Sequence, residues 1–152
     1  MAACFDSVRG REVCDSGMVT SRIQATLPWE AEKVWNVVTA VERYTWRSDL
    51  SRTERIGERQ FVEYTKNGYA TTFTITAEEP CRRWEFDMEN SNMRGHWTGI
   101  FTGRGGETEV EFTEQIAVKN PLLRLFVKGY LRRQQAQFLA DLRRALAQPA
   151  EE

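Results

Sequence analysis

The chain has 152 residues, of which 41% are hydrophobic and 28% are charged, and its formal net charge is −1 at pH 7. This length and balance are typical of one globular domain that buries a substantial core, and they exclude a disordered chain. The near-neutral charge gives no general attraction to nucleic acid, and no stretch approaches the ~20 apolar residues of a membrane span. We therefore expect no nucleic-acid partner and no stable membrane insertion.

Residues 1–18 are polar and show no sustained hydrophobic period, which predicts a flexible N-terminal extension. The segment also lacks the apolar centre of a signal peptide, so we expect a cytoplasmic protein. The three cysteines are Cys4, Cys14 and Cys81, and an odd number without an export signal predicts free thiols. Because His96 is the single histidine and the cysteines are scattered, we expect no metal site and no obligatory cofactor.

The first ordered elements are predicted to be a strand and a helix. Residues 19–27 alternate between apolar and polar side chains and are rich in β-branched residues, which indicates a strand. Pro28 suits the first turn of a helix, and Val34 and Val38 recur at helical spacing after it. Residues 44–50 are interpreted as a second short helical turn.

Six further strands are predicted before the last helix. Asn67-Gly68 is a strong hairpin turn, because both positions tolerate a positive φ. In one strand Trp84 and Phe86 share a face while charged residues occupy the other, which is typical of a half-buried strand. The predicted strands are 51–56, 59–66, 69–77, 82–89, 94–102 and 108–117.

The period changes from strand-like to helical at Asn120-Pro121, and residues 121–146 are predicted to form one long helix. Its apolar stripe consists of Leu123, Phe126, Val127, Tyr130, Leu131, Phe138, Leu142 and Leu146. A long amphipathic helix beside a long antiparallel sheet predicts an α+β domain over residues 19–148. The space between the two layers is a natural pocket for an apolar small molecule.

The element order and several short segments resemble the START/polyketide-cyclase superfamily, also called SRPBCC, which includes the birch-pollen-allergen fold. The segments are L-P-W-E-A-E-K-V-W at 27–35, V-E-R-Y-T-W at 41–46 and R-R-W-E-F at 82–86. The resemblance covers residues 19–146. It implies a helix-grip fold: a curved antiparallel sheet around a long C-terminal helix, with two short helices after the first strand. In that family the cavity holds lipids, sterols, polyketides or hormones, and some members are cyclases or dehydratases.

Aromatic side chains are the first candidates for ligand contact. Those predicted to point between the sheet and the last helix are Phe73, Trp84, Phe86, Trp97, Phe101, Phe112, Phe126 and Tyr130. Such residues either fill an ordinary core or line a cavity, and for the group we favour a cavity. Placing Trp97 on the inner face turns His96 outward, which argues against His96 as a general base.

Polar candidates are fewer. Glu114 shares a face with Phe112, so it either pairs with an Arg or Tyr at the cavity mouth or is twisted into water, and we favour the second. Glu63 and Tyr64 lie on opposite faces of one strand, and Tyr64 fits the pocket better. Gln134 interrupts the apolar face of the last helix, where it can contact a ligand head group.

The sequence thus predicts a protein that binds a hydrophobic or amphipathic small molecule as a monomer or homodimer. One alternative is a metal-free enzyme of the cyclase/dehydratase kind, which would hold a polyketide-like substrate against aromatic walls and polarise a carbonyl. Another is an interaction module with a collapsed cavity. No acid–base constellation is visible in the sequence, so binding is preferred over catalysis.

Overall fold

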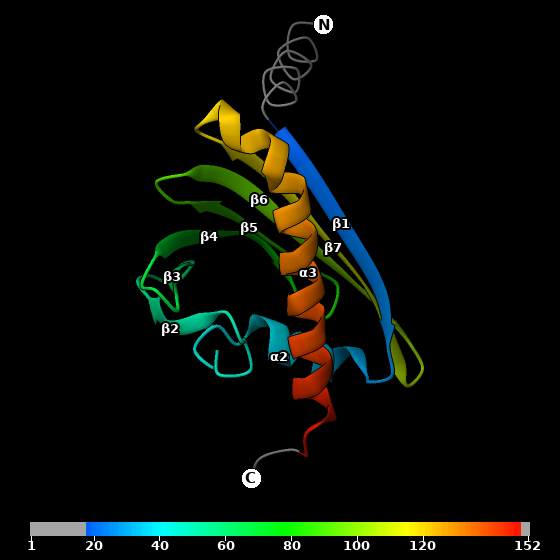
Figure 1. Ribbon diagram of the computed structural model, residues 1–152. Helices are drawn as coiled ribbons and strands as arrows, with labels where there is room; N and C mark the ends of the chain where they lie inside the picture. The colour runs from blue at the N-terminus through cyan, green and yellow to red at the C-terminus, as the bar shows by residue number, and fades with distance from the viewer. Residues whose placement is uncertain (1–17, 150–152) are drawn as a thin grey trace, which may run out of the picture.

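The computed structural model describes residues 18–149. Seven antiparallel strands form one curved sheet in the order β1-β7-β6-β5-β4-β3-β2, and the long helix α3 crosses its concave face (Figure 1). The elements are β1 (Met18–Leu27), α2 (Ala31–Thr39), β2 (Leu50–Arg55), β3 (Gln60–Thr65), β4 (Ala70–Glu79), β5 (Arg83–Glu89), β6 (Met93–Arg104), β7 (Glu107–Val118), the 3₁₀ turn η1 (Pro121–Leu123) and α3 (Arg124–Ala147). The predicted helix-grip architecture is confirmed.

Tight turns and bulges give the sheet its shape. Gly68 and Gly105 have φ values of 85° and 66°, so glycine suits the β3–β4 and β6–β7 hairpins. The register shifts between Leu50 and Arg52 in β2 and between Ile75 and Ala77 in β4. Such bulges bend a strand and increase its twist, which curls this side of the sheet toward α3.

One end of the concave face is filled by side chains. The indole of Trp35 on α2 packs edge-on against Phe101 of β6, with ring centroids 5.1 Å apart. Val34 of α2 and Leu142 and Leu146 of α3 are completely buried. The C-terminal half of α3 and the helix α2 therefore close this end of the fold, which is the lower end in Figure 1.

Two details differ from the sequence predictions. Residues 44–49 form turns in place of the second short helix predicted over 44–50, and Leu50 begins β2. The physical reason is a side-chain contact. The backbone N–H of Ser48 donates to the Asp141 carboxylate on α3 at 2.8 Å instead of to a carbonyl one helical turn earlier. The extension predicted over residues 1–18 lies outside the described residues except for Met18, which begins β1.

A buried amide holds the middle of α3 against the sheet. Gln135 donates from Nε2 to the carbonyl oxygens of Ser21 on β1 and Phe112 on β7, at 2.9 and 3.3 Å. Its Oε1 accepts from the Ser21 hydroxyl at 2.7 Å. Because every polar atom of this amide is paired, its burial is compatible with stability and fixes the position of the helix along β1.

A buried carboxylate holds the C-terminal half of α3 against the loop between α2 and β2. Asp141 accepts from the Ser48 hydroxyl at 2.8 Å and from Gln137 at 2.8 Å, in addition to the Ser48 N–H and Arg144. Burial alone would raise the pKa of Asp141, but these hydrogen bonds outweigh it and hold the pKa below its ordinary range.

We predict that Asp141→Asn lowers the free energy of unfolding by about 1–3 kcal/mol at neutral pH, because the amide cannot accept every hydrogen bond that the carboxylate accepts. The lowered pKa means that the contribution of Asp141 is present above the ordinary carboxyl pKa and disappears as pH falls through the folded pKa. The free energies of unfolding of wild type and Asp141→Asn, measured with urea, should therefore become equal in acid. Exposed Glu58→Gln is the control, and equal stability of Asp141→Asn and wild type at neutral pH would contradict the assignment.

Candidate functional site

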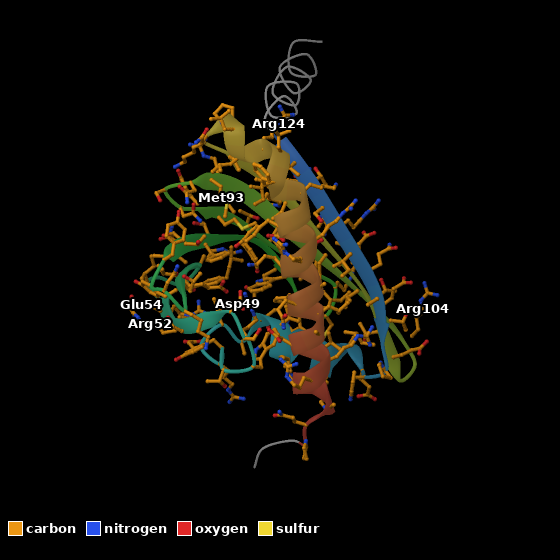
Figure 2. All side chains as sticks on the ribbon, viewed as in Figure 1. Asp49, Arg52, Glu54, Met93, Arg104 and Arg124 are labelled. Atoms are coloured by element: carbon orange, nitrogen blue, oxygen red, sulfur yellow. The ribbon has the colours of Figure 1, made fainter. Side chains whose placement is uncertain are left out.

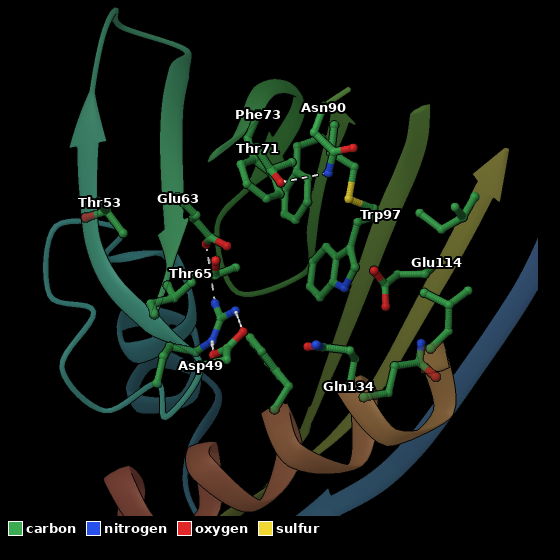
Figure 3. A pocket seen from close by; sticks show the side chains of 18 of the residues that line it. Asp49, Thr53, Glu63, Thr65, Thr71, Phe73, Asn90, Trp97, Glu114 and Gln134 are labelled. Carbon is green, nitrogen blue, oxygen red and sulfur yellow. Dashed lines mark hydrogen bonds and ion pairs between the residues drawn. The ribbon is translucent and has the colours of Figure 1, made fainter. Parts of the chain in front are cut away.

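A cavity of about 350 Å³ lies between the concave face of the sheet and the N-terminal half of α3. It borders the filled end at Val38 of α2, and Figure 3 shows it from close by. The apolar side chains that line it from the sheet include Phe61, Phe73, Trp84, Phe86, Met88, Trp97, Phe112 and Ile116, and those from α3 include Val127, Leu131 and Phe138.

The aromatic wall is a continuous packed layer. Phe61 stacks on Phe73, and Phe86 stacks on Trp97, each pair with centroids 4.9 Å apart. The Trp97 indole lies over Gly99 of β6, where an added Cβ would come within 2.6 Å of the ring. The rings therefore support one another from the sheet side and form a preformed apolar surface.

The opposite side of the cavity carries an arginine that is surrounded by acidic groups. Arg47 makes a bidentate pair with Asp49, Nε to Oδ1 and Nη2 to Oδ2, both at 3.0 Å. Its Nη1 lies 3.4 Å from Glu63 Oε2 on β3, and its guanidinium lies over the Phe138 ring at 4.9 Å. Figure 3 shows Asp49 and Glu63 facing the same space.

Glu114 of β7 faces this group across the cavity (Figure 3). Within residues 18–149 its carboxylate has no hydrogen-bond partner. Burial raises its pKa to about 7, and the attraction of Arg47 only partly opposes this while repulsion from Glu63 adds to it. Burial likewise raises the pKa of Glu63, although Arg47 stabilises its charged form. The cavity thus holds a carboxyl group that exchanges its proton near neutral pH.

Two further polar pairs lie at the cavity rim. Gln134 donates from Nε2 to the hydroxyl oxygen of Tyr130 at 2.9 Å, one turn apart on α3. Asn90 donates to the Thr71 hydroxyl at 3.0 Å between β5 and β4. The Tyr130 hydroxyl hydrogen and the Gln134 carbonyl oxygen stay available to a bound molecule.

Most of the predicted site residues line this cavity, namely Phe73, Trp84, Phe86, Trp97, Phe112, Glu114, Tyr130 and Gln134. Their contact with a ligand stays a prediction. The expectation that strand twist carries Glu114 into water is wrong, because β7 stays in regular register with β6 there and keeps alternate residues inward.

Three predicted residues lie elsewhere. Tyr64 is on the outer face, where its ring lies 3.8 Å from the Arg52 guanidinium and its hydroxyl donates to Glu54 on β2. Figure 2 labels Arg52 and Glu54 at this edge of the sheet. Phe101 is buried but covered by Trp35 of α2, so it belongs to the filled end. Phe126 is 72% exposed because the buried stripe of α3 runs through Val127 and not one residue earlier.

Arg47, Asp49 and Glu63 were missed by the sequence analysis. Strand alternation puts either Glu63 or Tyr64 on the inner face, and Phe61 and Val62, which are both apolar, do not decide between the two faces. The pairing of Phe61 with Phe73 fixes the choice, since it puts Glu63 on the cavity side. Arg47 and Asp49 lie in an irregular segment with no period to interpret.

His96 lies on the outer face of the sheet, as predicted. Its Nδ1 is 2.7 Å from Asp87 and its Nε2 is 2.7 Å from Glu85, both on the neighbouring strand β5. Burial would lower the pKa of His96, but the two carboxylates raise it above its ordinary value. The histidine is therefore a cross-strand ionic contact and not part of the cavity.

Among residues 18–149, no cluster of His, Cys, Asp and Glu side chains has an arrangement suited to a metal ion. In the same part of the chain no helix combines the length and the apolar character needed to cross a membrane. The chemistry available to the cavity from these residues consists of aromatic surface, hydrogen bonding and the proton of a carboxyl group.

Comparison with known proteins gives matches over almost the whole chain. A family model described as "Polyketide cyclase / dehydrase and lipid transport" matches residues 18–147, and no curated protein matches. A START superfamily protein from Mycobacterium smegmatis is 12% identical with a TM-score of 0.75, covering 85% of this chain and 96% of its own. The Zhui aromatase/cyclase from Streptomyces sp. R1128 is 12% identical with a TM-score of 0.75, covering 85% and 93%. A conserved protein from Geobacillus kaustophilus is 14% identical with a TM-score of 0.74, covering 85% and 95%. At these identities the structures establish the shared fold.

We predict that Glu114→Gln flattens the pH dependence of stability. Because the folded pKa of about 7 lies above the ordinary glutamate value, Glu114 favours folding below the ordinary pKa, and this contribution is lost as pH rises through 7. Wild type should lose about 1–3 kcal/mol of unfolding free energy between about pH 5 and about pH 8, and the variant less. Denaturant melts across this range measure it. Adding Glu63→Gln to Glu114→Gln should reduce the dependence of the unfolding free energy on pH further. If this dependence is the same in wild type and in Glu114→Gln, the assignment is refuted.

Proposed function

This chain belongs to the family of polyketide cyclases, dehydrases and lipid-transport proteins, and we propose that it binds a hydrophobic or amphipathic small molecule, lipid- or polyketide-like, in the cavity under α3. The observation that carries the proposal is the cavity itself. Its volume of about 350 Å³ lies within the range of small-molecule sites, and its walls combine aromatic rings with a few convergent polar groups. An interaction module with a collapsed interior would not leave this space.

The two kinds of wall have separate roles in the proposal. Trp84, Phe86 and Trp97 would bury the apolar part of the ligand, where each buried methylene group contributes about 0.8 kcal/mol. Glu114 and Gln134 would hold the polar part, since both reach the same space from opposite sides (Figure 3). Binding strength would then come from the rings and orientation from the polar groups.

The proposal is tested with Trp84→Ala and a matched control, Trp35→Ala. Both side chains are buried, so each truncation should cost about 3–5 kcal/mol of stability. Only Trp84 lines the cavity, so only its loss should reduce the mass of co-purified ligand seen by native mass spectrometry of protein from its host. Trp84→Phe keeps a ring and serves if the alanine variant does not fold. Retained ligand that is unaffected at Trp84, or no ligand from any host preparation, would count against the proposal.

The second candidate function is an enzyme of the cyclase/dehydratase kind, and one observation favours it. Glu114 has a pKa of about 7, faces the cavity, and has no hydrogen-bond partner within the described residues. A general base works best when its pKa lies near the working pH. The ionised carboxylate would take a proton from the carbon beside a carbonyl. The enolate carbon would then bond to a second carbonyl carbon, and Glu114 would return the proton to the resulting alkoxide. Loss of water would complete an aldol-type ring closure.

This candidate predicts that Glu114→Gln reduces the turnover of a poly-β-keto thioester by about 10²–10⁴-fold, since proton transfer typically supplies that factor. Ligand affinity should change far less. The wild-type rate should rise with pH through about 7 as the base ionises. Glu109→Gln, an exposed change on the same strand, is the control. Turnover that persists in Glu114→Gln would exclude this residue as the base. If wild type binds the thioester without turning it over, the protein is a binding protein and this second function is excluded.

A further inference from the structure

The charged side chains that line the cavity are Arg43, Arg47, Asp49, Glu63 and Glu114. Arg43 is exposed at the rim, where water and salt screen its charge. The inner group therefore consists of one guanidinium and three carboxyl groups, contributed by the loop before β2, by β3 and by β7. With one guanidinium among three carboxyl groups, this inner group carries no net positive charge that would attract an anion, and it gains negative charge as Glu114 ionises.

The inner arginine is already occupied. Each of its three nitrogens has a carboxylate oxygen within 3.4 Å, two from Asp49 and one from Glu63. Three of its five N–H bonds point to carboxylates, and Asp49 and Glu63 already balance its positive charge, so Arg47 offers little net attraction to a further anion. Arg47 is thus a poor receptor for a carboxylate or a phosphate.

Glu114 is in the opposite situation. Its carboxyl group points into the free space (Figure 3) and has acceptor oxygens with no donor among the described residues. Gln134 reaches the same cavity from α3, where its carbonyl oxygen is a second acceptor, while one N–H of its amide is used by Tyr130. Trp84, Trp97 and Phe86 line the adjoining wall, and aromatic faces attract cations and repel anions.

Resting on the proposed binding function, we infer that the polar end of the ligand is a hydrogen-bond donor, a protonated amine or a hydroxyl, which bonds to Glu114 and Gln134. Ligands that end in a carboxylate or a phosphate are rejected, so free fatty acids and phospholipids are excluded from this cavity. The aromatic wall holds the apolar remainder.

The affinities for an amine and for a hydroxyl compound should depend on pH in different ways. A protonated amine pairs with the ionised form of Glu114, so its affinity should increase as pH rises through about 7. The cavity groups that face Glu114 are Arg47 and Glu63, and the raised pKa of Glu63 acts in the same direction. A hydroxyl can donate to the carboxylate or accept from the carboxylic acid, so its affinity should change little.

Isothermal titration calorimetry with decylamine, decanol and decanoate tests this, because the three compounds share one chain and differ only in the head group. At about pH 8, decylamine and decanol should bind at least about tenfold more tightly than decanoate, a difference of about 1.4 kcal/mol. Decanoate that binds as tightly as decanol would overturn the inference while leaving the binding function intact. Failure of all three compounds to bind would overturn the inference together with binding of this ligand class.

Two variants separate the cavity from the protein surface. Glu114→Gln should abolish the rise in decylamine affinity with pH and lessen the preference over decanoate. Glu109→Gln removes one negative charge from the exposed side of the same strand and should leave both unchanged. If Glu109→Gln weakens decylamine binding as much as Glu114→Gln does, the amine is attracted by surface charge and the assignment to the cavity is wrong.

Discussion

The structure depends on the attachment of one helix to one side of a sheet that is much wider than the helix. Seven strands at ~4.8 Å spacing span roughly 29 Å, whereas a helix with side chains is about 10 Å wide. Gln135 fixes the middle of α3 to β1 and β7, and Asp141 fixes its C-terminal half to the loop before β2. Held there, α3 cannot cover the whole concave face. The helix α2 fills one end, and the remainder is the cavity.

The cavity combines a stable apolar wall with a polar group that is costly to bury. The aromatic layer on β3 to β7 packs ring on ring and contributes to the core. Arg47, Asp49 and Glu63 compensate one another by ion pairing, but Glu114 is left without a partner within the described chain, and its pKa rises to about 7 in consequence. A fold selected only for stability would place an apolar residue there, so this local conflict supports the proposal that the cavity is a functional site.

The same sheet carries carboxylates on both faces, and their surroundings give them different chemistry. On the outer face, Glu85 and Asp87 pair with His96. Burial would raise the pKa of Glu85, but its hydrogen bonds with His96 and Arg83 hold that pKa below its ordinary value. On the inner face, Glu63 and Glu114 lie in an apolar enclosure that favours their neutral forms. Because side chains alternate along each strand, the ion pairs of His96 lie on one face of the sheet and the carboxyl groups of Glu63 and Glu114 lie on the other.

The sequence by itself determined the order of the elements, the long C-terminal helix and most of the aromatic wall. Period and turn chemistry are local properties, and Trp84, Phe86 and Phe112 each sit in strongly alternating strands. Glu114 and Gln134 were also candidates from the sequence, whereas tertiary structure alone brought Arg47, Asp49 and Glu63 to the cavity. The choice of Glu63 over Tyr64 depended on the register between β3 and β4, and the position of Arg47 depended on a loop fixed by Asp141, far away in the sequence. The same holds for Phe101, which only the packing of α2 removes from the cavity. Such contacts have no local signature, because their energies arise between segments that the fold alone brings together.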